Sequence, residues 1–134
     1  FLALFADMSD SETFWHVIAR HWSSFDRIPH NDFRDLFSCH RPSWNSSHLP
    51  GDALKAFQDL STTLTVYRGG DAETVAEGLS WTQRIDVAEA FASGHRGIKP
   101  QRPIVMAKTV ELSDVAFVCV DRDEDEVVLF DFPN

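Results

Sequence analysis

The feature that most constrains this chain is a change in hydrophobic period near residue 62. Before that point, large apolar residues recur three and four positions apart, as Phe14, Ile18 and Trp22 do, which is the spacing of one helix face. After it, apolar and polar residues alternate, beginning with "LTVYRG" at 64–69, which is the pattern of a β-strand. Helices followed by sequential strands predict an α+β protein with an antiparallel sheet.

The expected elements follow from this pattern and from capping residues. Helices are predicted after a cap at Ser9 or Ser11, after Pro29, and over 52–60. Thr82 is expected to cap one more helix, which ends near residue 93. The expected strands are 64–69, 79–82, 104–112, 115–120 and a last one that begins near Glu124.

The length predicts a single domain. The chain has 134 residues, which is within the usual size of one domain. A chain of this length buries about two thirds of its unfolded surface, and eleven Phe and four Trp supply large apolar side chains. We therefore expect one domain over 1–134, with a helical part at 1–62 and a β-rich part at 63–134.

The net charge restricts the binding partners. Twelve basic and twenty-one acidic residues give a formal charge of -9, and such a field repels the phosphate backbone of nucleic acids. It leaves room for a small basic pocket that binds one phosphorylated ligand. The apolar run at 1–6 is too short to span a bilayer, so neither nucleic acid nor membrane is an expected partner.

The cysteines predict neither a disulfide framework nor a metal site. Cys39 and Cys119 are the two cysteines, and they lack the spacing of zinc ligands. We therefore expect no metal cofactor. Their number is compatible with the cytoplasm of a producing or a target cell and leaves secretion open.

Two segments carry residues suited to ligand binding. Arg68 ends an apolar strand and is followed by Gly69; a guanidinium can hold a phosphate bidentately, and a glycine lets a ligand approach the backbone. The ordinary alternative is a surface arginine before a turn. Strand alternation places Ser80 and Thr82 on one face and Trp81 on the other, although Trp81 also suits a core position.

The third segment is acidic. In "EDEVVL", a strand that begins near Glu124 would place Glu124 and Glu126 on one face and Asp125 on the other. Two neighbouring carboxylates can divide labour, because one stays ionised while the pKa of the other is raised. A solvated acidic hairpin is the ordinary alternative.

The order of the three segments resembles a known family. An Arg, then Ser-x-Thr, then Glu-x-Glu is similar to ADP-ribosyltransferases of the R-S-E type, which include arginine-modifying bacterial toxins and phage transferases. The resemblance rests on "VYRG", on "GLSWT" followed by "DVAEAFA", and on "EDEVVL", and it covers about 64–130. It implies a split β-sandwich of two antiparallel sheets with N-terminal helices, and NAD as co-substrate.

The resemblance also implies roles for the first two segments. Arg68 would contact the NAD phosphates or the nicotinamide ribose, and the backbone of Gly69 would bind the nicotinamide carboxamide. Ser80 would orient the catalytic glutamate by a hydrogen bond, and Thr82 would support its strand. Tyr67 is expected to belong to the same NAD-binding set.

For the acidic segment, the resemblance implies the chemistry itself. Glu126 would hold a ribose hydroxyl and stabilise an oxocarbenium-like transition state as nicotinamide leaves. Glu124 would position or deprotonate the acceptor, and a glutamate there implies arginine as the acceptor. Phe91 would face the nicotinamide, with a core position as its alternative. The same chemistry follows from the charge that develops at an anomeric carbon during glycosidic cleavage.

The expected function is mono-ADP-ribosylation of a protein by a bacterial or phage effector. Two alternatives stay open: an NAD glycohydrolase that uses the same site, and a non-catalytic protein-binding domain on the same scaffold. The resemblance implies a protein substrate and leaves open an inhibitor or immunity protein. Trp81 is bulkier than the residue that many toxins have there, and the short segment 93–103, in which His95 and Arg96 could meet a phosphate, leaves the target open.

Overall fold

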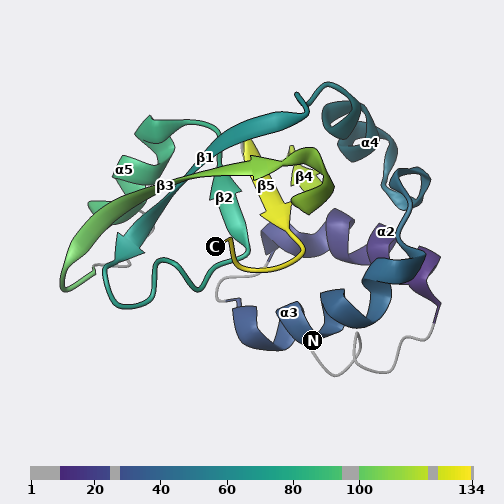
Figure 1. Ribbon diagram of the computed structural model, residues 1–134, viewed down its shortest axis with the longest axis horizontal. Coiled ribbons are helices and arrows are strands. Elements are labelled where there is room, and N and C mark those ends of the chain that lie inside the picture. The colour runs from purple at the N-terminus through teal and green to yellow at the C-terminus, as the bar shows by residue number, and fades with distance from the viewer. Residues whose placement is uncertain (1–9, 25–27, 95–99, 121–123, 134) are drawn as a thin grey trace.

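The computed structural model describes residues 10–24, 28–94, 100–120 and 124–133. It confirms the α+β expectation, with helices packed against an antiparallel sheet of five strands in the order β3-β1-β2-β5-β4 (Figure 1). The helices and strands are α2 (Ser11–His21), α3 (His30–His40), α4 (Gly51–Gln58), β1 (Thr63–Asp71), β2 (Ser80–Thr82), α5 (Ile85–Ala92), β3 (Pro103–Glu111), β4 (Val115–Cys119) and β5 (Glu126–Leu129).

The sheet has a narrow junction. β1 and β3 pair along their whole length, from Thr63 opposite Glu111 to Asp71 opposite Pro103. β1 meets β2 through a single residue pair, Tyr67 opposite Thr82, and β2, β5 and β4 continue as a compact three-stranded part. The described strands therefore form one hydrogen-bonded sheet and not the two sheets that we expected. The junction of β1 and β2 is the place in this sheet where the fewest residues pair.

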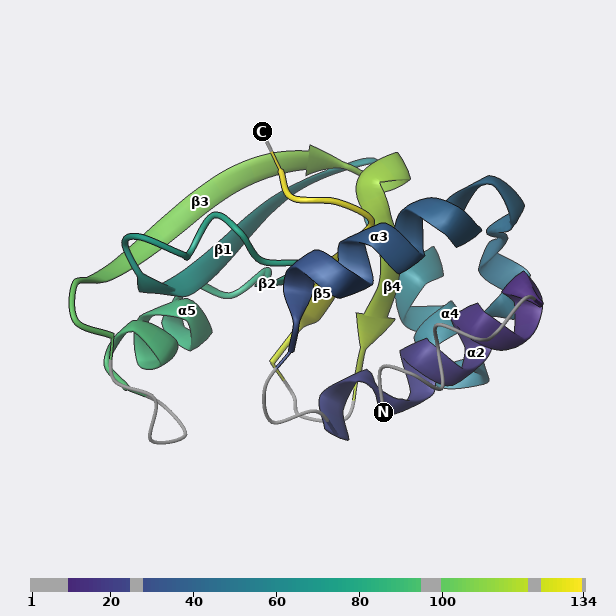
Figure 2. The ribbon, with the colours of Figure 1, turned by 90° about the horizontal axis from the view of Figure 1, so that it is seen from below.

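The N-terminal helices cover one face of the three-stranded part (Figure 2). Helical spacing correctly predicted the buried residues, because Phe14, Trp15 and Ile18 of α2 are inaccessible to solvent. The cap of α2 is Asp10 and not Ser11, because the Asp10 carboxylate accepts a hydrogen bond from the Glu12 amide at 3.3 Å; Ser9, the other expected cap, lies outside the described residues. The apolar residues that form this cluster are Phe14, Trp15, Ile18, Ala19, Trp22, Phe33, Phe37, Leu49, Ala53, Leu79, Ala116, Phe117, Cys119, Val128 and Phe130.

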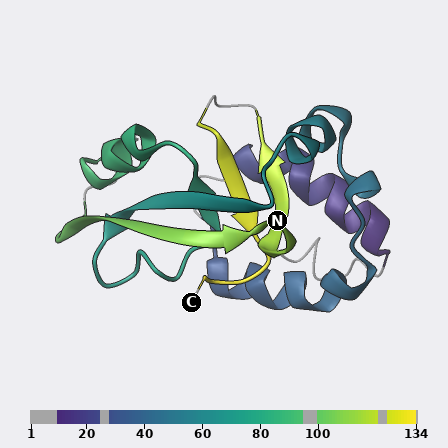
Figure 3. The ribbon, with the colours of Figure 1, turned by 45° about the horizontal axis from the view of Figure 1, so that its top comes forward.

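The opposite face of the sheet carries a mainly aliphatic cluster. Trp81 belongs to it, which confirms that Trp81 faces away from its two hydroxyl-bearing neighbours. Helix α5 lies against the β1–β3 ribbon, at the end of the sheet remote from α2 and α4 (Figure 3). The residues of this second cluster are Leu64, Val66, Trp81, Val110, Val115, Val118, Val127 and Leu129.

Three expected element boundaries near the predicted site were wrong. β1 continues to Asp71 and does not end at residue 69. Helix α5 begins at Ile85, and its N-cap residue is Arg84 without a side-chain cap, so Thr82 belongs to β2 instead of capping the helix. β5 begins at Glu126, because Asp125 has φ 45°, a left-handed conformation that interrupts the alternation of a strand. None of the helices in the described ranges is long and apolar enough to cross a membrane.

Candidate functional site

Arg68 extends from β1 to the start of β2. Its Nη1 donates a hydrogen bond to the Ser80 carbonyl oxygen at 2.8 Å. A Cβ on Gly78 would lie 2.2 Å from Arg68 Cζ, so only glycine leaves space there for the guanidinium. Gly78, which lies two residues before the start of β2, thus determines where Arg68 is held, a link that the sequence pattern did not indicate.

His30 is the functional candidate that sequence reasoning missed. It begins α3, and its Nδ1 accepts a hydrogen bond from the Leu79 amide at 3.0 Å. Its Nε2 lies 3.4 Å from Arg68 Nη2. His30 precedes Arg68 by 38 residues and belongs to no motif, so only the folding of the helical part onto the sheet reveals it.

Both groups are electrostatically perturbed. Burial lowers the pKa of Arg68 to about 10, and the nearby Glu126 charge offsets part of this effect. Arg68 therefore stays protonated at neutral pH. Burial, with a contribution from the Arg68 charge, lowers the pKa of His30 to about 3, so this imidazole is neutral at physiological pH.

Ser80 is held from the side opposite the ribbon. Its hydroxyl accepts a hydrogen bond from Trp22 Nε1 at 2.7 Å, while its carbonyl accepts the Arg68 bond. The described contacts thus give the Ser80 hydroxyl a tryptophan partner where we expected a glutamate. A hydroxyl that accepts one bond still carries a proton to donate, so Ser80 retains one interaction for a ligand or a carboxylate.

A row of residues crosses the narrow junction. Tyr67 lies opposite Thr82, and Thr82 lies opposite Glu126. Residues that face each other across neighbouring strands project from the same face of the sheet. The row therefore brings the half-buried Tyr67 and Glu126 to the face that also carries Ser80, as strand alternation requires.

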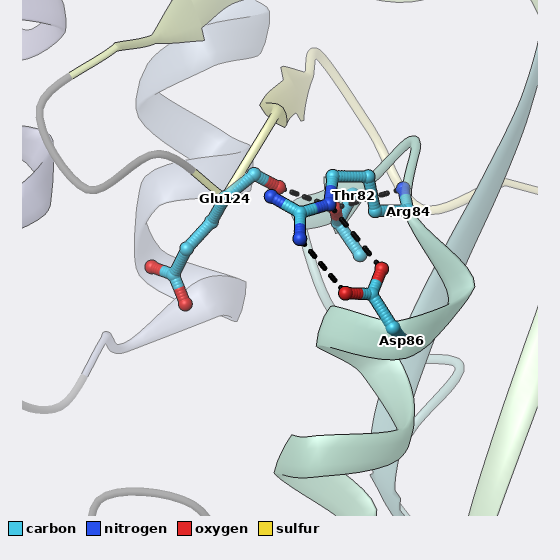
Figure 4. A network of polar contacts seen from close by, with 4 residues as sticks. All are labelled: Thr82, Arg84, Asp86 and Glu124. Atoms are coloured by element: carbon cyan, nitrogen blue, oxygen red, sulfur yellow. Dashed lines mark hydrogen bonds and ion pairs between the residues drawn. The ribbon is translucent and has the colours of Figure 1, made fainter.

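Thr82 connects β2 to the acidic segment. Its hydroxyl donates to the Glu124 carbonyl oxygen and accepts from the Arg84 amide at 3.1 Å. Figure 4 shows these two bonds together with the exposed bidentate pair between Arg84 and Asp86. In the same view the Glu124 carboxylate is directed away from that pair, so Thr82 fixes the backbone from which Glu124 projects.

The glutamates differ from the expected arrangement. Glu124 precedes β5, and the left-handed Asp125 separates it from Glu126. Simple alternation therefore does not relate the two side chains, because only Glu126 belongs to the strand. Both are half-buried; Glu126 lies in β5, and Glu124 lies just before that strand.

Helix α5 packs against Gly69 and carries Phe91. A Cβ on Gly69 would lie 1.8 Å from the Ala88 carbonyl oxygen and 2.9 Å from the Ala92 amide nitrogen. This glycine thus allows the α5 backbone to approach β1. The helix fills the space beside Gly69 in which we expected a ligand. Phe91 is half-buried on α5.

A solvent-accessible hollow of about 440 Å³ opens between the end of α4, the end of β4 and the turn before β5. None of Arg68, Ser80 or Glu126 lines it. Arg68 is instead covered by His30 and by the segment around Gly78. The residues that line the hollow are Ala56, Asp59, Leu60, Ser61, Gln83, Val118, Cys119, Val120 and Asp125.

The described residues contain no group of three or more His, Cys, Asp or Glu side chains that could hold a metal ion. His95 and Arg96 lie outside the described residues. The predicted residues that the structure brings together are thus Arg68, Ser80 and Glu126, joined by Thr82 and Tyr67 through the strand register. Comparison with protein families, with curated proteins and with solved structures found no match to this chain.

Proposed function

We propose that this protein is a mono-ADP-ribosyltransferase that transfers ADP-ribose from NAD to an arginine of a protein. The observation that carries the proposal is the convergence of Arg68, Ser80 and Glu126 at the junction of β1, β2 and β5. These residues come from the three segments whose order resembles R-S-E transferases. The narrow junction between the ribbon and the three-stranded part supports the proposal of a split sheet as the scaffold.

The proposed reaction breaks the bond between C1′ of the ribose and the nicotinamide nitrogen. The bonding electrons leave with nicotinamide, and positive charge develops at C1′, as it does in glycoside hydrolysis. The Glu126 carboxylate would stabilise that charge, and Arg68 would neutralise a phosphate of the same NAD molecule. A fixed charge in a partly dehydrated site acts more strongly than in water, because little solvent screens it.

Glu124 is proposed to act on the acceptor. An arginine guanidinium is protonated and therefore a poor nucleophile, so a base has to take one of its protons before the nitrogen attacks C1′. The Glu124 backbone is fixed by Thr82, and its half-buried side chain lies just before β5. In this assignment Glu126 acts on the donor sugar and Glu124 on the incoming nitrogen.

Access to Arg68 is a condition of the proposal. Since His30 and the segment around Gly78 cover the guanidinium, NAD has to displace at least one of these neighbours. Ligand-dependent opening of this kind is common in enzymes that exclude water from the reaction. The proposal therefore includes a small shift of the start of α3 away from β1.

Transfer of labelled ADP-ribose from NAD to proteins of a cell lysate tests the proposed function. Glu126→Gln should reduce labelling by about two to three orders of magnitude, because it removes the charge that stabilises the transition state. Glu89→Gln is the matched control, since it makes the same chemical change at an exposed position of α5, and it should label like the wild type. Equal labelling by the Glu126 variant and the wild type would refute the role of Glu126.

Two further measurements separate the alternatives. Nicotinamide release from NAD without any acceptor, as fast as with lysate, would replace the transferase with a glycohydrolase. Calorimetry that detects no NAD binding by the wild type would replace both enzymes with a protein-binding domain.

A further inference from the structure

The buried guanidinium of Arg68 is short of hydrogen-bond acceptors. An arginine carries five N–H donors and no acceptor. Among the described residues, the Ser80 carbonyl oxygen accepts from Nη1, whereas the Nε atom is buried without any hydrogen-bond partner. An unpaired buried donor is destabilising, and more so when it is charged. Such an arrangement is typical of a group whose acceptor arrives with a ligand.

His30 offers Arg68 a donor and not an acceptor. Its Nδ1 accepts from the Leu79 amide and so cannot carry a proton. The neutral ring therefore carries its proton on Nε2, the atom that lies 3.4 Å from Arg68 Nη2. Two N–H groups thus face each other, and this contact is not a hydrogen bond in either direction.

The surroundings add further positive potential. Helix α3 begins at His30, and its N-cap residue, Pro29, makes no side-chain cap bond. The first amides of a helix carry partial positive charge, and anions bind there. Arg68 supplies a full positive charge beside this helix end, with Glu126 nearby and Asp32 in the first turn of α3, and an anion bound here would give Arg68 Nη2 and His30 Nε2 an acceptor.

We propose that His30 and Arg68 together form an oxyanion site, in which one phosphate oxygen is bound between His30 Nε2–H and Arg68 Nη2–H. The ligand class is a pyrophosphate ester, and its assignment as the pyrophosphate of NAD rests on the proposed function. Entry of the oxygen separates the two nitrogen atoms and turns a donor–donor contact into two hydrogen bonds. His30 thereby makes α3 a part of the ligand site, a role that its position in the chain does not suggest.

Calorimetry with inorganic pyrophosphate, ADP-ribose, NAD and adenosine tests the site. The wild type should bind the three phosphorylated ligands and bind adenosine much more weakly. His30→Phe keeps a ring of similar size but removes Nε2–H, and it should weaken pyrophosphate and ADP-ribose binding about 10- to 100-fold, the value of one charge-assisted hydrogen bond. His40→Phe is the matched control, because His40 is a buried histidine that bonds Ser11 instead of Arg68.

Nitrogen-15 NMR of the histidine rings gives a signal that pyrophosphate would leave unchanged if His30 had only a structural role. Saturation of the wild type with pyrophosphate should shift the Nε2–H signal of His30 and leave His40 unchanged. Unchanged His30 signals at saturation would overturn the oxyanion site, and this test remains decisive if His30→Phe does not fold.

The outcomes distinguish this inference from the proposed function. If NAD binds and transfer occurs but His30→Phe binds ADP-ribose as the wild type does, the oxyanion site is refuted and the transferase stands. If pyrophosphate binds with a His30 dependence while NAD neither binds nor reacts, the site is supported and the transferase is refuted. If the wild type binds no phosphorylated ligand, both are refuted.

Discussion

The two ends of the short strand β2 differ in how they are built. At the Ser80 end, Ser80 is bonded by Arg68 of β1 and by Trp22 of the N-terminal part. At the Thr82 end, the buried Thr82 is bonded to Arg84, two residues later, and to Glu124 next to β5. The Ser80 end thus joins β2 to the helical part of the chain, whereas both partners at the Thr82 end belong to the β-rich part.

The charges of the two ends differ in the same way. The Ser80 end holds a guanidinium and a neutral imidazole, and burial lowers the pKa of both groups strongly. Beside the Thr82 end lie the half-buried Glu124 and Glu126 and the exposed Asp86, which is paired with Arg84. A buried cation suits a phosphorylated donor, and half-exposed acids suit a cationic acceptor that arrives from solvent. The difference teaches that one strand three residues long can separate the proposed donor and acceptor sides.

The largest effect is expected from Gly69→Ala, which disturbs the strand that carries Arg68. The new Cβ would lie 1.8 Å from the Ala88 carbonyl oxygen, so the α5 backbone has to move. We expect a loss of about 3 kcal/mol in the free energy of unfolding, measured by urea denaturation. Gly51→Ala is the control, since nothing lies within 4 Å of its added Cβ, and it should not destabilise. A Gly69 variant as stable as the Gly51 variant would contradict the packing of α5.

Acid should lower the free energy of unfolding through His30, which lies next to the Ser80 end of β2. Its pKa is about 3 in the folded protein and about 6.5 in an unfolded chain. The unfolded chain then binds more protons between these values, so this contribution to stability is complete above about pH 6.5 and is lost as the pH falls toward 3. The slope is at most about 1.4 kcal/mol per pH unit.

Urea unfolding between about pH 6.5 and 5 checks this prediction, because most carboxylates stay ionised in that range. The nearby Arg68, whose pKa is about 10, keeps its charge there. His30→Phe should be less sensitive to pH than the wild type. Equal slopes for the two proteins would show that His30 titrates normally in the folded state.

The smallest effects compare the two hydroxyl groups of β2. Ser80→Ala removes the hydroxyl that accepts a hydrogen bond from the fully buried Trp22 indole, and we expect a loss of about 2 kcal/mol. Thr82→Val removes the hydroxyl that bonds the Glu124 carbonyl and the Arg84 amide. Both of these residues are only half-buried, so about 1 kcal/mol is expected. Urea denaturation of both variants measures the difference, and a greater loss from Thr82→Val would reverse the comparison.

The sequence predicted more of the Thr82 end of β2 than of the Ser80 end. Alternation in 80–82 correctly separated Ser80 and Thr82 from Trp81, and helical spacing found the core of α2. The expected start of the last strand failed because a single left-handed residue, Asp125, interrupts the alternation. His30 could not be predicted, since its contact with Arg68 depends on how α3 packs against the sheet and not on any local pattern.

The contact of Trp22 and His30 with β2 and β1 limits how this chain can be divided. Periodicity separates residues 1–62 from 63–134, and a shortened protein beginning at residue 63 would contain every motif of the resemblance. It would nevertheless lack the indole that holds Ser80 and the imidazole beside Arg68. The helical part therefore cannot be removed without loss of these contacts, and any unit that is excised or fused to another protein has to include it.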